Sequence, residues 1–240
     1  MPVRFNINKA YNLYKQAGGS TNFESSLKQV LKFMQNDVNV NNAEEAAYFL
    51  ATAKSESDYS LQRWEADYLC GEKGVPYQGQ PCQRALNYYR SSDGKANYYN
   101  KGVDSTGTPY FGRGLIQITH KYNYKRYGDL IGVDLVDKAD KAMIPENSYK
   151  IASAYLNRKT FKHVNNGDLT KARISVNGGT KGVDRTNKSY YRWLKIFQNP
   201  AVNFKYFFWT KKRRIYFGIM TALGLAVGGY FMYRAIKLRR

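Results

Sequence analysis

The chain has 240 residues, enough for one domain of good size with an appendage, and it carries a formal net charge of +20. This charge favours anionic partners such as a lipid surface or an acidic polymer. The two cysteines have no histidine or second cysteine pair at the spacing of a zinc site, which argues against a structural metal.

The chain begins with MPVRFNINKAYNLYKQ, which lacks the uninterrupted apolar core of a secretory signal peptide, so export by the ordinary route is not expected from this end. Thr21 and Glu24 then form a capping-box pattern ahead of apolar residues at helical spacing, which predicts an amphipathic helix to about Asn36. Asn42 and Glu45 repeat the pattern before a second apolar stripe, which continues to the polar sequence SESDYS.

Glu56 lies at the polar end of this second predicted helix. A carboxylate where a buried helix emerges is a candidate general acid, although a solvated helix end is the alternative. Glu65 follows nine residues later, with Asp67 as the fallback. A straight helix would separate Glu56 from Glu65 by about 13 Å, so we predict that the chain turns after Ser57. Trp64 fits either a ring that faces a ligand or core packing.

Cys70 and Cys82 bound a short segment rich in glycine, GEKGVPYQGQP. A local disulfide that closes this loop is one interpretation, and two free thiols are the other. A disulfide would indicate that the domain works outside a reducing cytosol.

Residues 110–124 read YFGRGLIQITHKYNY and combine a glycine turn with an apolar run. Glycines on both sides of Arg113 permit a tight turn and a close approach of other backbone or of a ligand. Gln117 is a polar residue within the run LIQI, which is typical either of a substrate cleft or of a buried strand. Thr119 follows at the end of the run.

This segment resembles the central signature of glycoside hydrolase family 19, the plant-type chitinases and many phage endolysins. In that family a GRG turn is followed by an (L/P)IQ(I/L)(S/T) run and an N-Y-N-Y-like tail. The resemblance implies a mainly α, lysozyme-like bilobed helical domain with at most a small β-element. It also implies hydrolysis of β-1,4 bonds between amino sugars by an inverting two-carboxylate mechanism, with neither cofactor nor metal.

The resemblance assigns roles to individual residues. AAYFLATAKSES is similar to a family helix that ends in H-E-(S/T), so Glu56 corresponds to the catalytic acid and Ser55 replaces the family's histidine. Glu65 corresponds to the general base, and Thr119 is expected to position the attacking water. The string DLTKARISVNGGTKGVDRTNKSYYRWLKIF resembles the family's last signature block. The residues expected to line the sugar subsites are Arg113, Gln117, Tyr122, Asn123, Asn177 and Arg185.

Residues 215–233 form a run of nineteen residues without a charge, flanked by KKRR and RAIKLRR. At 1.5 Å per residue this run spans roughly 28 Å, close to the hydrocarbon core of a bilayer, and predicts one C-terminal transmembrane helix rather than a buried core helix. Gly224 and Gly228 form a GxxxG pattern, a weak indication of helix pairing and of a homo-oligomer.

These patterns divide the chain into a hydrolase domain (1–200), a basic juxtamembrane linker (201–214), the predicted span (215–233) and a basic tail (234–240). Up to Phe204 the body carries 29 Lys and Arg against 18 Asp and Glu. This excess suits peptidoglycan, with its free peptide carboxylates, better than neutral chitin, and a merely soluble basic surface is the alternative. We expect no nucleic-acid partner.

Two rival interpretations remain: a membrane-anchored wall-binding protein without hydrolysis, and a basic tether with a merely structural body. An anchor without a signal peptide leads us to expect the membrane of a lipid-containing phage virion, beside virion structural proteins. A cellular tail-anchored protein, or an endolysin released by the phage's own pore, is the alternative.

Overall fold

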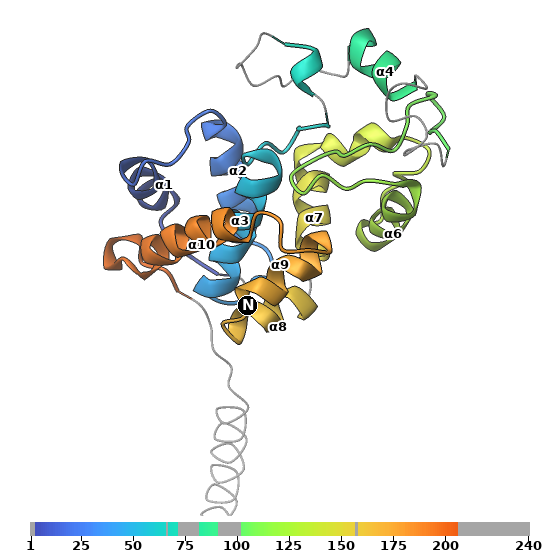
Figure 1. Ribbon diagram of the computed structural model, residues 1–240. Coiled ribbons are helices and arrows are strands. Elements are labelled where there is room, and N and C mark those ends of the chain that lie inside the picture. The colour runs from blue at the N-terminus through green and yellow to red at the C-terminus, as the bar shows by residue number, and fades with distance from the viewer. Residues whose placement is uncertain (1–2, 66, 72–81, 91–101, 157, 206–240) are drawn as a thin grey trace, which may run out of the picture. The chain divides into compact units, whose positions relative to one another are not determined.

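The computed structural model describes residues 3–65, 67–71, 82–90, 102–156 and 158–205. In these ranges the chain is mainly helical, and its only strand-like pairings are isolated bridges (Figure 1). The mainly α prediction is therefore confirmed. The helices are α1 (Ile7–Gln16), α2 (Glu24–Met34), α3 (Ala43–Ser57), η1 (Asp67–Leu69), α4 (Gln83–Arg90), α6 (Lys121–Ile131), η2 (Ala139–Met143), α7 (Pro145–Tyr155), α8 (Arg158–Asn165), α9 (Leu169–Asn177), α10 (Val183–Gln198) and η3 (Pro200–Val202).

Helix α3 is the centre of the core and is buried on nearly every side. Asn42 caps its start, because its side chain accepts a hydrogen bond from the backbone N–H of Glu45 at 2.8 Å. Five buried alanines in α3 let neighbouring helices approach closely, and α10 packs along it (Figure 1). On α10, Trp193 stacks on Tyr14 and donates its indole N–H to the hydroxyl of Tyr59 at 2.8 Å. These contacts fix the end of α3, where Glu56 lies.

One of the predicted helix starts differs from the structure. Helix α2 begins at Glu24 after Phe23, and no side chain caps it, so the capping box predicted from Thr21 and Glu24 does not form. The side chain of Glu24 instead pairs with Lys28 one turn later, at 2.6 Å. The predicted turn after Ser57 is present, because the two residues that follow it adopt left-handed backbone conformations.

A second, smaller apolar cluster lies beside the main core. It joins Trp64 to Phe111, with ring centroids 5.9 Å apart, and Tyr89 of α4 stacks on the same phenylalanine at 4.5 Å. Cys70 and Cys82 form a disulfide at its edge, with Cα atoms 5.6 Å apart. Trp64 is fully buried, so its ring packs in the core and does not face a ligand.

Several predictions on the C-terminal part of the chain fall outside the described residues. These are the transmembrane helix at 215–233 with its two glycines, the tail at 234–240 and most of the linker at 201–214. Within the part that the structure describes, no helix is long and apolar enough to cross a membrane.

Candidate active site

Glu56 projects from the last turn of α3 and is paired with an arginine from α9. Its Oε1 accepts a hydrogen bond from Nη1 of Arg173 at 2.6 Å. The side chain of Arg173 is 6% exposed and that of Glu56 is 22% exposed, so the pair is largely shielded from water. The Nε of Arg173 also donates to the carbonyl of Lys181 at 3.1 Å, which ties the loop between α9 and α10 to the same guanidinium.

Two tyrosines complete the surroundings of Glu56. Burial raises the pKa of Tyr48 to about 12, with a smaller lowering effect from Arg173. Burial, and then the negative charge of Glu56, raise the pKa of Tyr155, whose hydroxyl donates to the carbonyl of Val176 at 2.6 Å. Both phenols therefore stay protonated at neutral pH, and the guanidinium supplies the positive charge at this carboxylate.

Ser55 connects α3 to the start of α10. Its hydroxyl lies 2.9 Å from Oγ1 of Thr186, which is fully buried, and its carbonyl accepts a hydrogen bond from Nη2 of Arg185 at 3.4 Å. The serine that replaces the family's histidine thus joins the two helices beside Glu56. Arg185 lies on the exposed side of this junction.

The second carboxylate, Glu65, is attached to the signature segment through Gly112. The backbone N–H of Glu65 donates to the carbonyl of Gly112 at 2.7 Å, and its Oε2 accepts from the N–H of the same glycine at 3.3 Å. A further bond, from the N–H of Gly114 to the carbonyl of Arg63 at 2.6 Å, extends this pairing. The fallback, Asp67, is 4% exposed and pairs with Arg63, while burial raises the pKa of its carboxyl.

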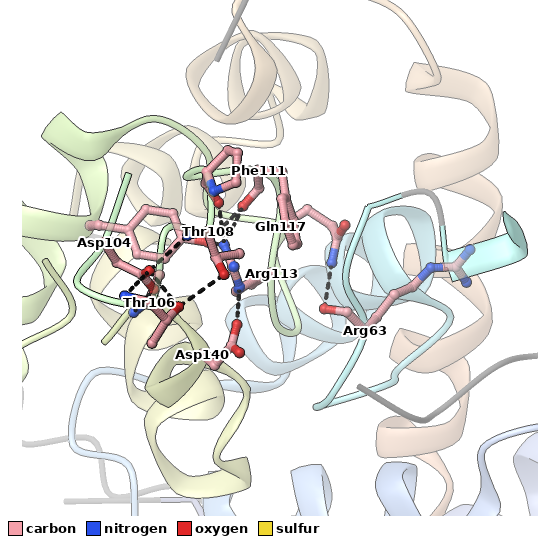
Figure 2. Close-up of polar contacts among 11 residues, drawn as sticks. Arg63, Asp104, Thr106, Thr108, Phe111, Arg113, Gln117 and Asp140 are labelled. Carbon is pink, nitrogen blue, oxygen red and sulfur yellow. Dashed lines mark hydrogen bonds and ion pairs between the residues drawn. The ribbon is translucent and has the colours of Figure 1, made fainter. Parts of the chain in front are cut away.

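Arg113 is buried with 1% exposure and organises the signature segment from inside (Figure 2). Its Nε donates to Asp140 at 2.7 Å, and its Nη1 donates to the carbonyl of Pro109 at 3.1 Å and to the hydroxyl of Tyr124 at 2.9 Å. The guanidinium also lies 3.8 Å from the ring centroid of Phe111. It has no surface with which to bind a sugar, so we assign this residue to the fold instead of to the predicted subsites.

Gln117 and Thr119 meet at Gly112. A Cβ added to this glycine would lie 3.0 Å from Oε1 of Gln117 and 3.4 Å from Oγ1 of Thr119. The amide of Gln117 donates to the carbonyl of Gly114 at 2.8 Å and to that of Arg63 at 3.1 Å, as Figure 2 shows for the second contact. Three predicted site residues, Glu65, Gln117 and Thr119, are therefore gathered around one glycine.

The remaining predicted sugar ligands fall into two places. Asn123 donates to the carbonyl of Thr119 at 2.8 Å, and Tyr122 is 69% exposed at the start of α6. Asn177, at the end of α9, donates to the carbonyl of Lys181 at 3.1 Å, the same carbonyl that Arg173 contacts. Asn123 thus lies beside Thr119, whereas Asn177 shares a carbonyl with the arginine partner of Glu56.

A hollow of about 670 Å³ is lined by His120, which follows Thr119, and by Asn177. In the residues that the structure describes, no cluster of three or more His, Cys, Asp or Glu side chains is arranged to hold a metal ion.

The sequence interpretation missed Arg173, the partner of Glu56. The helical spacing of the sequence could have indicated that Arg173 is buried, because it lies on the same face of α9 as Leu169, Ala172 and Val176. A charged residue on an apolar face needs a buried partner of opposite charge.

Comparisons with known proteins find a matching family model, similar sequences and similar structures. The family model described as chitinase class I matches residues 28–157, which include both carboxylates and the signature segment. "Chitinase 11" of Oryza sativa subsp. japonica is 62% identical over 38 residues, which are 16% of this chain and 15% of that protein. "Endochitinase 2" of Solanum tuberosum is 33% identical over 104 residues, which are 43% of this chain and 29% of that protein.

The chain thus spans less than a third of the length of either relative. Among solved structures, chitinase C from Streptomyces griseus aligns with a TM-score of 0.52 and 18% identity, over 80% of this chain and 75% of that one, which shows a shared fold. Because the family model covers more than half of its residues, the chain belongs to the chitinase class I family, glycoside hydrolase family 19.

Proposed function

We propose that the chain hydrolyses β-1,4 bonds between amino sugars with inversion, with Glu56 as the general acid and Glu65 as the general base. The observation that supports this most is the attachment of Glu65 to Gly112, beside Gln117 and Thr119. Through this attachment the carboxylate of Glu65 is held at the signature segment, while the carboxylate of Glu56 is held at the end of α3. An inverting pair should stand roughly 6.5 to 9.5 Å apart, to admit a water molecule.

In this mechanism Thr119 orients the water. Its hydroxyl donates its single proton to the carbonyl of Gln117 at 3.0 Å, so its lone pairs are left to accept a hydrogen bond from water. The carboxylate of Glu65 takes the other proton of that water as it attacks the anomeric carbon. Gly112, which contacts both groups, sets their relative position.

On the leaving-group side, Glu56 gives its proton to the glycosidic oxygen. The carboxylate formed in this step is stabilised by Arg173, whose Nη1 lies 2.6 Å from Oε1. Because the guanidinium is held in turn by the carbonyl of Lys181, it needs little reorganisation during the reaction.

We propose peptidoglycan as the polymer, since a basic body suits a glycan with free peptide carboxylates. Chitin is the second candidate, and the names of the relatives favour it. Zymograms with peptidoglycan and with glycol chitin separate the two substrates.

Glu56→Gln should abolish both activities without unfolding the protein, because the amide cannot donate the proton. Glu146→Gln, an exposed glutamate paired with Lys150, is the matched control and should keep the parent rate.

Hydrolysis by Glu56→Gln at the parent rate would remove this residue from the mechanism. Glu65→Gln should also be severe, whereas Asp67→Asn should affect stability more than rate, because Asp67 is buried against Arg63. A larger loss of activity in Asp67→Asn than in Glu65→Gln would contradict the assignment of the base.

We further propose that residues 215–233 anchor the hydrolase domain in a membrane, and that Gly224 and Gly228 pair two copies there. The support is the uncharged run with basic flanks. The proposed location is the membrane of a lipid-containing phage virion, beside virion structural proteins, where the hydrolase would open the wall. Recovery of the protein with the membrane of purified particles would support this location, and its presence only in infected-cell lysate or in uninfected cells would refute it.

A further inference from the structure

A second hollow, of about 860 Å³, lies at the start of α3, the opposite end of this helix from Glu56. Glu45 lines it, and at 1.5 Å per residue this glutamate lies about 16 Å from Glu56 along the helix. The other walls come from the loop before α3, the end of α7 and from α8, which packs beside α3 (Figure 1). No described residue lines both this hollow and the one at Asn177, so the two are separate.

The buried carboxylate of Glu45 holds the side-chain amides of this hollow in place. Glu45 is 5% exposed, and its Oε1 accepts a hydrogen bond from Nδ2 of Asn165 at 2.8 Å. Its Oε2 accepts from the backbone N–H of Asn41 at 2.7 Å and from Nδ2 of the same residue at 3.3 Å. Asn165 in turn accepts from Asn42, the cap of α3, at 3.1 Å. This network orders the wall before any ligand arrives, which lowers the entropic cost of binding.

The loop before α3 offers hydrogen-bond acceptors to the hollow. Asn39 donates its side-chain NH₂ to the hydroxyl of Ser153 on α7 at 2.9 Å, and Asn41 donates its own to the carbonyl of Asn39 at 3.0 Å. Within the part of the chain that the structure describes, the side-chain oxygens of Asn39 and Asn41 accept no hydrogen bond. Each of these oxygens can therefore bind a donor from a ligand.

The rest of the lining combines apolar surface with little net charge. Val38 and Ala154 contribute apolar side chains, and Asn166 contributes an exposed amide. Among the described residues that line the hollow, Lys162 and Glu45 are the charged ones, and their charges are opposite. Such a lining suits a neutral ligand that combines an N–H donor, a carbonyl acceptor and a methyl group.

A smaller hollow of about 340 Å³ adjoins the first at Asn166, which lines both. It includes Tyr191 of α10, which is 61% exposed and whose ring meets that of Tyr190 edge-on, with centroids 5.1 Å apart. An exposed aromatic ring presents an apolar face on which a sugar ring can lie. Asn187 and Thr170 supply polar groups beside it. The two hollows thus place directed amides next to an aromatic platform.

We propose that the two hollows, joined at Asn166, form an accessory binding site for a strand of N-acetylated amino sugars. The acetamido group of such a unit has an N–H for the side-chain oxygen of Asn39 or Asn41, a carbonyl for the amide of Asn166 and a methyl group for Val38. The proposal rests on the proposed hydrolase function and adds a second contact with the same polymer. Binding there raises the effective concentration of glycosidic bonds at the catalytic carboxylates.

Calorimetry tests the site without turnover. The full chain carrying Glu56→Gln, in mild detergent, is titrated with the hexamer of N-acetylglucosamine and with cellohexaose, which has the same linkage but no acetamido group. Adding Asn166→Ala/Tyr191→Ala should remove one bound hexamer per chain, and cellohexaose should not occupy this site. The matched control, Asn12→Ala/Leu130→Ala, changes exposed side chains of α1 and α6 and should keep the stoichiometry.

Three outcomes of this titration would overturn the accessory site: an unchanged number of bound hexamers in Asn166→Ala/Tyr191→Ala, the same loss in the control, or equal occupancy by cellohexaose.

Hydrolysis provides the second arm, in chains that retain Glu56. Asn166→Ala/Tyr191→Ala should lower the ratio of the rate on insoluble polymer to the rate on soluble hexamer by about tenfold, because only the polymer can occupy both sites at once. An unchanged ratio would also overturn the accessory site. A parent that hydrolyses neither substrate, while calorimetry still shows the loss of one hexamer, would refute the proposed function alone.

Discussion

The carboxylate of Glu56 and the guanidinium of Arg173 lie 2.6 Å apart, although 117 positions separate them in the sequence. At the scale of single residues, this contact fixes the position of the glutamate that we propose as the general acid. Two hydrogen bonds of the arginine, one to Glu56 and one to Lys181, connect α3 to the loop that follows α9. Within this largely shielded pair, the guanidinium lies where it would match the charge that Glu56 acquires on giving up its proton.

Replacement of this arginine tests its role. Arg173→Gln should lower kcat by about 100-fold with little change in KM, because the carboxylate formed on proton transfer loses its stabilising charge. Arg173→Lys should recover part of the rate, since it restores the charge without the planar fork. Steady-state kinetics and thermal unfolding are measured together. Arg126→Gln, at an exposed position of α6, is the control, and a parent-like kcat in Arg173→Gln would refute the role.

At the scale of an element, the backbone of the signature segment positions several of the proposed site residues. Gly112 holds the carboxylate of Glu65 through its N–H and lies against Gln117 and Thr119, so three catalytic candidates depend on the absence of one side chain. Arg113 supports this turn from the interior, through Asp140 of η2 and the hydroxyl of Tyr124. The element is therefore held by buried contacts on one side and presents the proposed catalytic residues on the other.

A methyl group at this glycine should disturb the site more than the fold. Gly112→Ala places a Cβ about 3.0 Å from Oε1 of Gln117, and we expect a loss of about 1–3 kcal/mol in unfolding free energy with a larger proportional loss of hydrolysis. Gly179→Ala is the matched control, because a Cβ there would meet nothing within 4 Å. Urea unfolding and initial rates measure the two effects. Full activity in Gly112→Ala would contradict the arrangement described for Thr119.

The turn around Asp104 ties the signature segment to η2 and makes the fold sensitive to acid. Burial acts to raise the pKa of this carboxyl, but hydrogen bonds from Thr106, Thr108 and Ala139 outweigh it, and the pKa lies below its usual value. The stabilisation is therefore present above the unfolded pKa of about 4 and is lost as the pH falls through the folded value.

Denaturant unfolding at pH 6 and at pH 3 tests this linkage. Asp104→Asn should be less stable than the parent at pH 6, and its unfolding free energy should change less between the two pH values. Asp129→Asn, at an exposed aspartate of α6, should retain the full pH dependence of the parent. An unaltered pH dependence in Asp104→Asn would show that other carboxyls carry the effect.

The disulfide stabilises the smaller apolar cluster, to which Trp64 and Phe111 belong. Its two ends are twelve residues apart, and closing such a loop contributes about 3 kcal/mol through the unfolded state. We expect Cys70→Ser/Cys82→Ser to lose about that amount and to loosen the segment that carries Glu65. Alkylation without reductant, followed by mass spectrometry, checks the bond itself. Two alkylated cysteines in the purified parent would refute it.

At the scale of the whole molecule, the sequence predicts the helices and turns better than it predicts the side-chain contacts between distant segments. The cap at Asn42 and the turn after Ser57 follow from local chemistry, so the position of Glu56 at a helix end could be read from the sequence. The burial of Arg113 could not, because an arginine between two glycines has the local pattern of an exposed turn. The pairing of Arg173 with Glu56 depends on how α9 meets α3, which no local pattern specifies.

Under the proposed function, different parts of the chain have different tasks. The domain up to residue 200 would provide the two carboxylates. If residues 215–233 span a membrane, diffusion is restricted to a surface, and attraction to an acidic wall then raises the local concentration of substrate. Catalysis and location would thus be assigned to separate parts of the sequence.

The central claim is that Glu56 and Glu65 act as an inverting acid and base, and the stereochemistry of the product tests it most directly. The parent enzyme is mixed with a soluble β-1,4-linked amino-sugar oligomer, and proton NMR follows the anomeric signals before mutarotation equilibrates them. Inversion at a β-linkage predicts that the α-anomer of the new reducing end appears first. First appearance of the β-anomer would show a retaining reaction and would contradict the assignment of Glu65 as a base acting on water.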